Sequence, residues 1–166
     1  MHPHTAAVAP TPIRVSAGAR PYLLAAPSAP TAPKVARDFV RAVLHRTPLA
    51  PLADTAVLLA SEAVTRSHLR APAGAGTTDI LVRVLTAAHG LRISVHDEGM
   101  ATAPAPRGEA GRQPDPEQPD RGVLLLTRLA DRWGTAPSEG PARSTSLWFE
   151  LYAASGDGSA GRGVSG

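Results

Sequence analysis

The chain has 166 residues, a formal net charge of +3 and no cysteine. Its length suits one domain with a buried core, and the lack of cysteine excludes disulfides, thiolate catalysis and cysteine-ligated zinc. The charge is modest, the arginines are scattered and only 4% of residues are aromatic, which argues against a nucleic-acid groove. No stretch approaches the ~18 apolar residues of a membrane helix. We expect a cytoplasmic protein that binds neither nucleic acid nor membrane.

The two ends of the chain differ from its middle. Residues 1–19 are rich in Ala, Pro and Thr with little periodicity, and residues 154–166 are almost entirely Gly, Ser, Ala and charged residues. Such compositions cannot bury enough apolar surface to fold. We predict disordered tails at both ends and a single domain over residues 20–153.

The first half of this domain predicts one short strand and two helices. Pro21 to Ala26 is suited to an edge strand. A helix is expected from near Ala32 to His45, where apolar residues recur at helical spacing, and a second from Leu52 to Leu69.

The second half predicts a hairpin, a long connection, a helix and a strand. Apolar residues alternate over residues 80–84 and 91–95, with His89-Gly90 as the turn between them. Residues 101–119 carry no apolar stripe and form a functional or disordered loop. A helix capped by Asp120 is expected to run to about Trp133, followed by a strand over residues 147–152. The fold class is α/β (α+β): a two-layer sandwich whose mixed, mostly antiparallel sheet carries helices on one face.

Three short motifs bear polar residues at places where chemistry is expected. They are Ser61-Glu62-Ala63-Val64-Thr65-Arg66 on the second helix, His96-Asp97-Glu98-Gly99 at a strand end, and Asp120-Arg121-Gly122-Val123-Leu124 at a helix start. In this order they resemble the Bergerat ATP-binding fold shared by gyrase, heat-shock protein 90, histidine kinases and mismatch repair proteins. Within that fold, the bacterial anti-sigma factor serine/threonine kinases are the most similar family.

The resemblance implies that Asp97 and Gly99 bind adenine. The carboxylate of Asp97 would accept a hydrogen bond from the exocyclic amine, and Gly99 would let the backbone approach the base. On spacing alone, the same residues could be an ordinary turn that ends a strand.

The resemblance also implies phosphate contacts at the start of the third helix, where backbone N–H groups are free. The residues concerned are Arg121, Gly122, Val123 and Leu124. A capped helix with a glycine in its first turn is the alternative. Thr145 matches a family threonine near the adenine, although Ser144 replaces the glycine that precedes it, and Thr145 could equally be a strand-entry residue.

In the anti-sigma kinases a glutamate and an asparagine lie four residues apart on the second helix. Glu62 matches the glutamate, the proposed general base, whereas Arg66 replaces the asparagine that holds Mg²⁺. Arginine has donors only and a permanent charge, so it cannot ligate Mg²⁺. Arg66 could pair with Glu62, contact ATP phosphates directly, or point outward as a surface residue. Of these we favour the pair with Glu62, which would also occupy the proposed base. We expect no metal ligand at this position.

The resemblance therefore implies an ATP-binding regulator, with a sigma factor and an anti-sigma antagonist as protein partners and a homodimer as its assembly. If active, it would transfer the γ-phosphoryl group of ATP to a serine. The alternative is a degenerate, non-enzymatic interaction module that binds ATP weakly or not at all. Arg66, Ser144 and the proline-rich loop favour the alternative.

Overall fold

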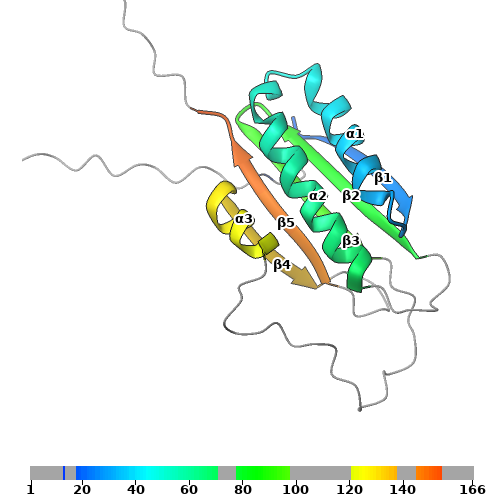
Figure 1. The fold of residues 1–166 in the computed structure, drawn as a ribbon. Coiled ribbons are helices and arrows are strands. Elements are labelled where there is room, and N and C mark those ends of the chain that lie inside the picture. The colour runs from blue at the N-terminus through cyan, green and yellow to red at the C-terminus, as the bar shows by residue number, and fades with distance from the viewer. Residues whose placement is uncertain (1–12, 14–17, 71–77, 98–120, 138–144, 155–166) are drawn as a thin grey trace, which may run out of the picture.

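The computed structural model of the protein describes residues 13, 18–70, 78–97, 121–137 and 145–154. It contains a five-stranded antiparallel sheet in the order β1-β2-β3-β5-β4, and the helices cover one face of it (Figure 1). The elements are β1 (Arg20–Pro27), α1 (Ala32–His45), the short 3-10 helix η1 (Ala50–Leu52), α2 (Ala53–Arg70), β2 (Asp79–Ala87), β3 (Gly90–Asp97), α3 (Arg121–Leu129), β4 (Arg132–Pro137) and β5 (Thr145–Tyr152). The predicted two-layer α/β fold is confirmed.

Helices α1 and α2 pack on each other and on the sheet through small and branched side chains. In α1 the buried residues recur every fourth position, and in α2 they form a wider stripe. This spacing places one face of each helix toward the sheet. The buried residues of the two helices are Ala32, Ala36, Val40, Leu44, Ala56, Val57, Leu59, Ala60, Ala63 and Val64.

The strands supply the other half of the core by strict alternation. Successive strand residues point to opposite faces, so every second side chain meets the helices. The buried strand residues of the core are Ile80, Val82, Val84, Leu91, Ile93, Val95, Phe149 and Leu151. The predictions for the first strand, both long helices, the central hairpin and the last strand are confirmed.

The turn of the central hairpin differs slightly from the prediction. Ala88 and His89 form the turn, and Gly90 is already the first residue of β3. A Cβ atom at Gly90 would collide with the carbonyl oxygen of Leu151 on β5. Gly90 therefore permits close approach of two strands.

The predicted helix from Asp120 to Trp133 is wrong in its last four residues. Helix α3 ends at Leu129, and β4 begins at Arg132. Asp131 turns the chain toward the sheet: its N–H donates to the carbonyl of Glu150 at 3.0 Å, and its carboxylate accepts from the N–H of Tyr152 at 2.8 Å. Trp133 still packs against the core, as the prediction required, but it does so from a strand.

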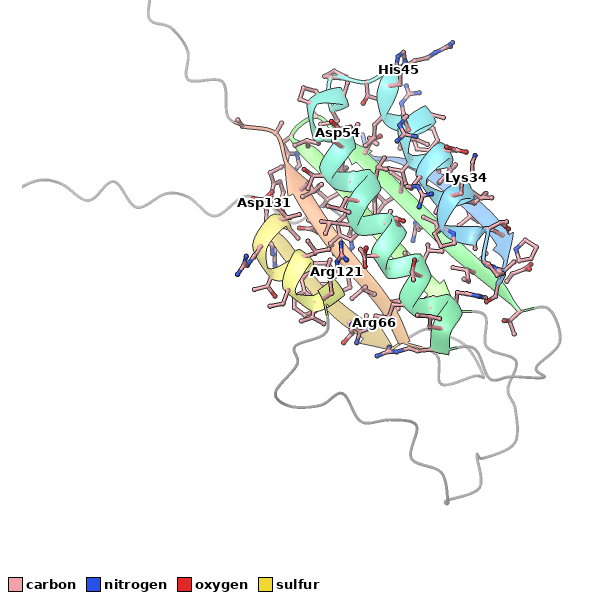
Figure 2. The ribbon with its side chains drawn as sticks, in the orientation of Figure 1. Lys34, His45, Asp54, Arg66, Arg121 and Asp131 are labelled. Atoms are coloured by element: carbon pink, nitrogen blue, oxygen red, sulfur yellow. The ribbon has the colours of Figure 1, made fainter. Side chains whose placement is uncertain are left out.

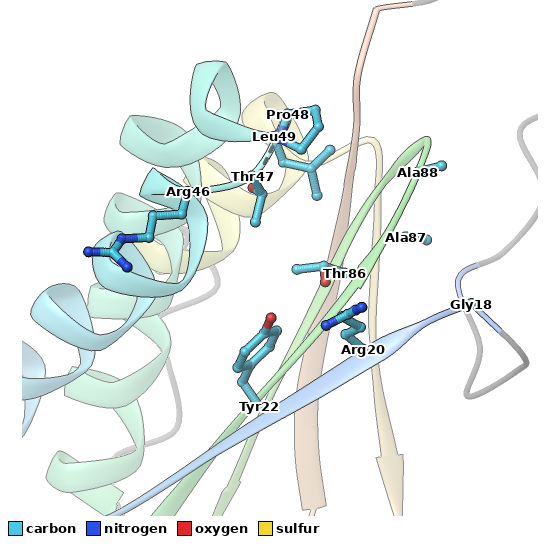
Figure 3. A pocket seen from close by; sticks show the side chains of 10 residues that line it. All are labelled: Gly18, Arg20, Tyr22, Arg46, Thr47, Pro48, Leu49, Thr86, Ala87 and Ala88. Atoms are coloured by element: carbon cyan, nitrogen blue, oxygen red, sulfur yellow. Dashed lines mark hydrogen bonds between the residues drawn. The ribbon is translucent and has the colours of Figure 1, made fainter.

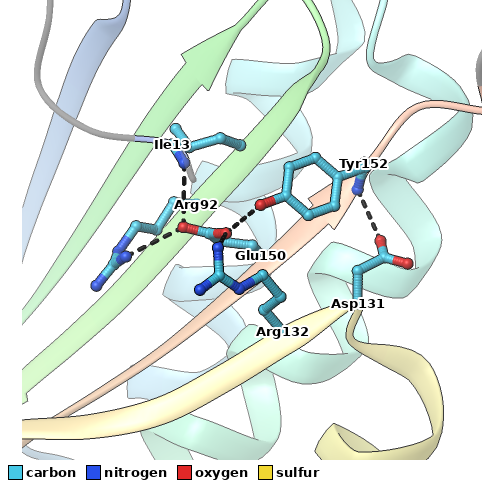
Figure 4. Close-up of polar contacts among 6 residues, drawn as sticks. All are labelled: Ile13, Arg92, Asp131, Arg132, Glu150 and Tyr152. Atoms are coloured by element: carbon cyan, nitrogen blue, oxygen red, sulfur yellow. Dashed lines mark hydrogen bonds and ion pairs between the residues drawn. The ribbon is translucent and has the colours of Figure 1, made fainter. Parts of the chain in front are cut away.

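The helix-free face of the sheet carries a buried acid, Glu150 (Figure 4). Its carboxylate accepts hydrogen bonds from the N–H of Ile13 at 3.3 Å, from Arg92 at 3.1 Å and from the hydroxyl of Tyr152. Ile13 belongs to the predicted N-terminal tail, yet only 2% of its surface is exposed. The rest of that prediction lies mainly outside the described residues, and the predicted C-terminal tail does so beyond residue 154.

None of the helices within the described ranges is long and apolar enough to span a lipid bilayer.

Candidate functional site

Two of the predicted site residues lie at one end of the sheet. Asp97 is the last residue of β3 and pairs with Ile80. On its other side β3 pairs with β5, with Val95 opposite Leu147. Continuing this antiparallel register by two residues places Asp97 opposite Thr145, the first residue of β5. Asp97 and Thr145 therefore lie at the same end of adjacent strands.

The carboxyl group of Asp97 has an unusual environment. Its Oδ1 atom is buried and accepts no hydrogen bond from any described residue. Leaving a buried acceptor without a donor costs roughly 1–3 kcal/mol, because the atom has lost its water. A ligand that brings an N–H group to this point would recover that free energy. The exocyclic amine of adenine is such a donor.

The neighbouring residue His96 shares this end of the sheet. Burial lowers the pKa of His96, the Arg83 guanidinium lowers it further, and the Asp97 carboxylate raises it. The low pKa favours a neutral imidazole beside Asp97, so the histidine does not add a positive charge to the site near neutral pH.

Helix α2 brings Glu62 and Arg66 over the sheet. The two residues lie one turn apart and both are half-buried. Residues i and i+4 of a helix share a face, so they project from the same side of α2. Helix α2 also contacts β3, the strand that ends in Asp97.

Two hydrogen bonds fix α2 in this position. Arg37 of α1 donates to the Ser61 hydroxyl at 2.8 Å, next to Glu62. Near the end of α2, the Ser28 hydroxyl and Nδ1 of His68 lie 3.0 Å apart. Arg37 and Ser28 were not among the residues predicted from the sequence. Arg37 has a signal in the sequence, because it is polar and follows the buried Ala36 on a predicted amphipathic helix. Ser28 has none, because it lies in the proline-rich connection before that helix.

The suggested pair between Glu62 and Arg66 is not among the ion pairs that join described residues. Those ion pairs link Lys34 and Arg41 to Asp38, and Arg92 and Arg132 to Glu150. The geometry therefore gives no support to a Glu62–Arg66 contact that would close the site.

Helix α3 supplies the last part of the site. It begins at Arg121 and packs against α2. Gly122 is buried and Arg121 is exposed. Figure 2 shows Arg121 and Arg66 on the side of the molecule where α2 and α3 lie next to each other. Two guanidinium groups and the positive end of the α3 dipole would favour a polyanion between these helices.

Several residues of the predicted site lie outside the part of the chain that the structure describes. Gly99 and Ser144 lie outside the described residues, as do the capping residue Asp120 and the loop before it. For Thr145 the structure gives the backbone position but not the side chain. The predicted contacts of Gly99 and Thr145 with adenine, and of Val123 and Leu124 with phosphate, stay predictions.

Comparison with known families identifies the class of protein. The profile of the histidine kinase-like ATPase domain matches residues 26–144, which is most of the chain. The protein belongs to this family and is an ATPase-like, nucleotide-binding domain. A search of curated proteins gave no match.

The residues of the site suit the expected nucleotide but do not suit the expected Mg²⁺. The buried, unpartnered oxygen of Asp97 suits the adenine of ATP. The position expected to hold Mg²⁺ carries Arg66, whose charge and lack of acceptor atoms oppose a divalent cation. The site is therefore suited to a nucleotide and poorly suited to the usual metal.

Proposed function

We propose that this ATPase-like domain is a regulator similar to the anti-sigma factor serine/threonine kinases. It would bind ATP and control a sigma factor by partner switching, with an anti-sigma antagonist as its second partner. The observation that carries nucleotide binding is the buried Oδ1 of Asp97, which needs a donor that no described residue provides. The protein partners and a homodimeric assembly rest on the family resemblance.

In this proposal Asp97 recognises the adenine base, and the start of α3 binds the phosphates. Adenine would donate its amine to Asp97, and the phosphates would extend toward Arg121 and the N–H groups around Gly122. Arg66 would contact phosphate oxygens directly, supplying positive charge where related domains use a metal. A guanidinium can bind two phosphate oxygens at once, so it also fixes their orientation.

Kinase activity requires one further step. Glu62 would accept the proton of a substrate serine hydroxyl as its oxygen forms a bond to the γ-phosphorus. The bond between the γ-phosphorus and the bridging oxygen breaks, and ADP leaves. Glu62 can take this role because no ion pair with Arg66 or another described residue engages its carboxylate.

A second candidate function is a non-enzymatic interaction module that retains the fold. Arg66 favours this candidate, because arginine at the metal position removes the ion that neutralises charge during phosphoryl transfer. Such a module would sequester its partner without phosphorylating it.

Isothermal titration with ATP, in EDTA and in excess Mg²⁺, tests the proposal and separates the two candidates. Binding that persists in EDTA supports direct contact between Arg66 and the phosphates. Tight binding only with Mg²⁺ supports an ordinary kinase and contradicts the proposed role of Arg66. No heat in either buffer supports the interaction module. Capture of partners from the native cell, followed by transfer of labelled phosphate from ATP to the captured proteins, tests the regulatory role.

A further inference from the structure

A hollow lies at the end of the sheet opposite Asp97. It has a volume of about 330 Å³ and opens between the turn after α1 and the adjoining ends of β1 and β2 (Figure 3). The β2–β3 register places Thr86, which lines the hollow, six residues from the Ile80–Asp97 pair along a strand of about 3.4 Å per residue. The hollow is therefore distinct from the nucleotide site. It is lined by Gly18, Arg20, Tyr22, Arg46, Thr47, Pro48, Leu49, Thr86, Ala87 and Ala88.

Three polar side chains converge on one wall of this hollow. Arg20 and Thr86 are directly opposite each other on β1 and β2, so they share a face of the sheet. Tyr22 lies two residues along β1 and therefore on the same face. Figure 3 shows the guanidinium of Arg20 near Thr86, with the hydroxyl of Tyr22 directed toward the same space.

The side chains of Arg20, Tyr22 and Thr86 form no ion pair or hydrogen bond with one another or with other described residues. No ion pair between described residues involves Arg20. Neither Tyr22 nor Thr86 forms a side-chain hydrogen bond with another described residue, although Thr86 is only 7% exposed. A guanidinium and two hydroxyl groups thus line one wall of the hollow, and no described side chain accepts a hydrogen bond from them. An oxyanion would satisfy all three.

The charge of the residues that line the hollow favours binding of an anion. The ten lining residues include two arginines and no acidic residue. Arg46 lies at the rim of the hollow, and Figure 3 shows its guanidinium pointing away from the other labelled side chains, so this group adds positive potential without a direct contact. Arg20 is the one lining residue positioned to form a bidentate contact.

Apart from Thr47, whose hydroxyl donates to the carbonyl of Leu44 at 2.9 Å, the remaining lining is apolar. Leu49 is 3% exposed, and Pro48, Ala87 and Ala88 complete this side. A volume of about 330 Å³ is at the lower end of the range for small-molecule sites. The hollow therefore matches a small molecule with an anionic head and a compact apolar body.

We propose that this hollow is a binding site for a small organic anion, whose carboxylate lies on Arg20, Tyr22 and Thr86 while its apolar body rests on Pro48 and Leu49. The site is independent of ATP and of the regulatory function proposed above. The carboxylate accepts two N–H bonds from Arg20 and one O–H bond from each hydroxyl.

Benzoate and benzamide form a matched pair of probes, because they share shape and differ in charge. We would titrate each into the isotopically labelled full chain and follow the backbone amide resonances. Benzoate should shift the amide resonances of Arg20, Tyr22, Thr47, Leu49 and residues 86–88 with half-saturation in the low millimolar range, and benzamide should bind at least about tenfold more weakly. Equal binding of the two probes, or no shift with benzoate at these residues, would overturn the proposal.

Two arginine variants separate the bidentate contact from general charge. Arg20→Gln should weaken benzoate binding at least about fivefold, whereas Arg46→Gln, an equal loss of charge on the same rim, should leave it nearly unchanged. Both arginines are exposed, so both variants should fold, and unfolding midpoints would verify this. Equal weakening by the two variants would contradict a specific site on Arg20. Since no step uses ATP, a failed ATP titration would leave this result standing.

Discussion

Arg92 on β3 donates a hydrogen bond to the carboxylate of Glu150 on β5, with 3.1 Å between nitrogen and oxygen. The two residues are directly opposite in the strand register. Glu150 is fully buried, whereas a quarter of the Arg92 side chain is exposed. Arg92 also lies over the Trp148 ring, 4.0 Å from its centroid. One arginine therefore joins an acid and an aromatic ring on the helix-free face of the sheet.

The first prediction concerns the substitution Glu150→Gln. The buried carboxylate receives charged or hydroxyl donors from Arg92, Arg132 and Tyr152. Glutamine keeps the shape but removes the charge and places an NH₂ group among these donors. We expect a loss of about 2–3 kcal/mol in the free energy of unfolding, measured by urea denaturation.

The control for this prediction is Asp38→Asn, which removes an acid paired with Lys34 at 2.7 Å on the surface. Exposed pairs contribute little, so its unfolding midpoint should stay near that of the wild type. A Glu150→Gln variant as stable as Asp38→Asn would show that the buried acid is not a stabilising centre.

The second prediction concerns alkaline pH and Tyr152. Burial raises the pKa of Tyr152, and its hydrogen bond to Glu150 raises it further, while Arg132 acts in the opposite direction. The folded protein thus keeps the phenol proton at a pH where the unfolded chain has lost it. The associated stability is present below the ordinary tyrosine pKa of about 10 and is lost as pH rises past it.

We expect Tyr152→Phe to lose less stability than the wild type between about pH 9 and pH 11, because phenylalanine does not titrate. Urea midpoints across this range measure the difference. Tyr22→Phe, which changes a tyrosine with no contact to Glu150, provides the comparison. Parallel alkaline curves for the wild type and Tyr152→Phe would refute the coupling.

The third prediction concerns acidic pH and His96. Burial first, and Arg83 second, lower the pKa of His96, with Asp97 acting in opposition. Below the ordinary histidine pKa of about 6.5 the unfolded chain binds a proton that the folded protein resists. Stability should therefore fall as pH decreases through this region.

The variant His96→Gln should flatten the dependence of stability on pH between about 7.5 and 5, as followed by denaturation at each pH. His45→Gln removes an exposed histidine at the end of α1 and should retain most of the wild-type slope. If both variants respond alike, burial of His96 is not the source of the acid sensitivity.

The fourth prediction concerns Asp97→Ala, which removes the buried oxygen that lacks a donor. Without ligand this variant should be at least as stable as the wild type, because an unsatisfied polar group is deleted. Its ATP affinity should fall by about 10- to 100-fold, the equivalent of about 1.4–2.8 kcal/mol. Thermal unfolding with and without ATP measures both effects.

Asp79→Ala serves as the control, since Asp79 is exposed at the same end of the sheet. It should change neither ATP affinity nor the shift in midpoint that ATP produces. A large loss of stability in Asp97→Ala without ligand would mean that its carboxylate has a structural role and would remove the main support for adenine binding.

The fold and part of the site could be predicted from the sequence, because the signals for them lie within short segments of the chain. The sequence itself shows apolar residues that alternate in residues 80–84 and 91–95 and that recur every four residues in α1. The boundary between α3 and β4 was missed because Trp133 contacts the core from either a helix or a strand. That boundary depends on Asp131 and its hydrogen bonds to β5, which is distant in sequence.

The buried acid was missed for a related reason. Glu150 alternates with Phe149 and Leu151 as any solvent-facing strand residue would, and the groups that surround its carboxylate include Ile13, 137 positions earlier in the chain. Asp97 could be predicted because its motif is local. The absence of a hydrogen-bond donor to its Oδ1 atom among the described residues could not be predicted, because this absence is a property of the packed structure.

The last prediction concerns Arg66→Asn, which restores a neutral oxygen ligand at the expected metal position. The arginine removes affinity for Mg²⁺ by charge and by lack of acceptors, so the variant should gain magnesium-dependent nucleotide affinity, on the order of tenfold. Binding in EDTA should weaken at the same time, because the direct phosphate contact is lost. Isothermal titration in both buffers measures the two effects, with Arg70→Asn, exposed at the end of α2, as the matched charge control. If Arg66→Asn and Arg70→Asn behave alike, Arg66 does not determine how this domain binds nucleotide.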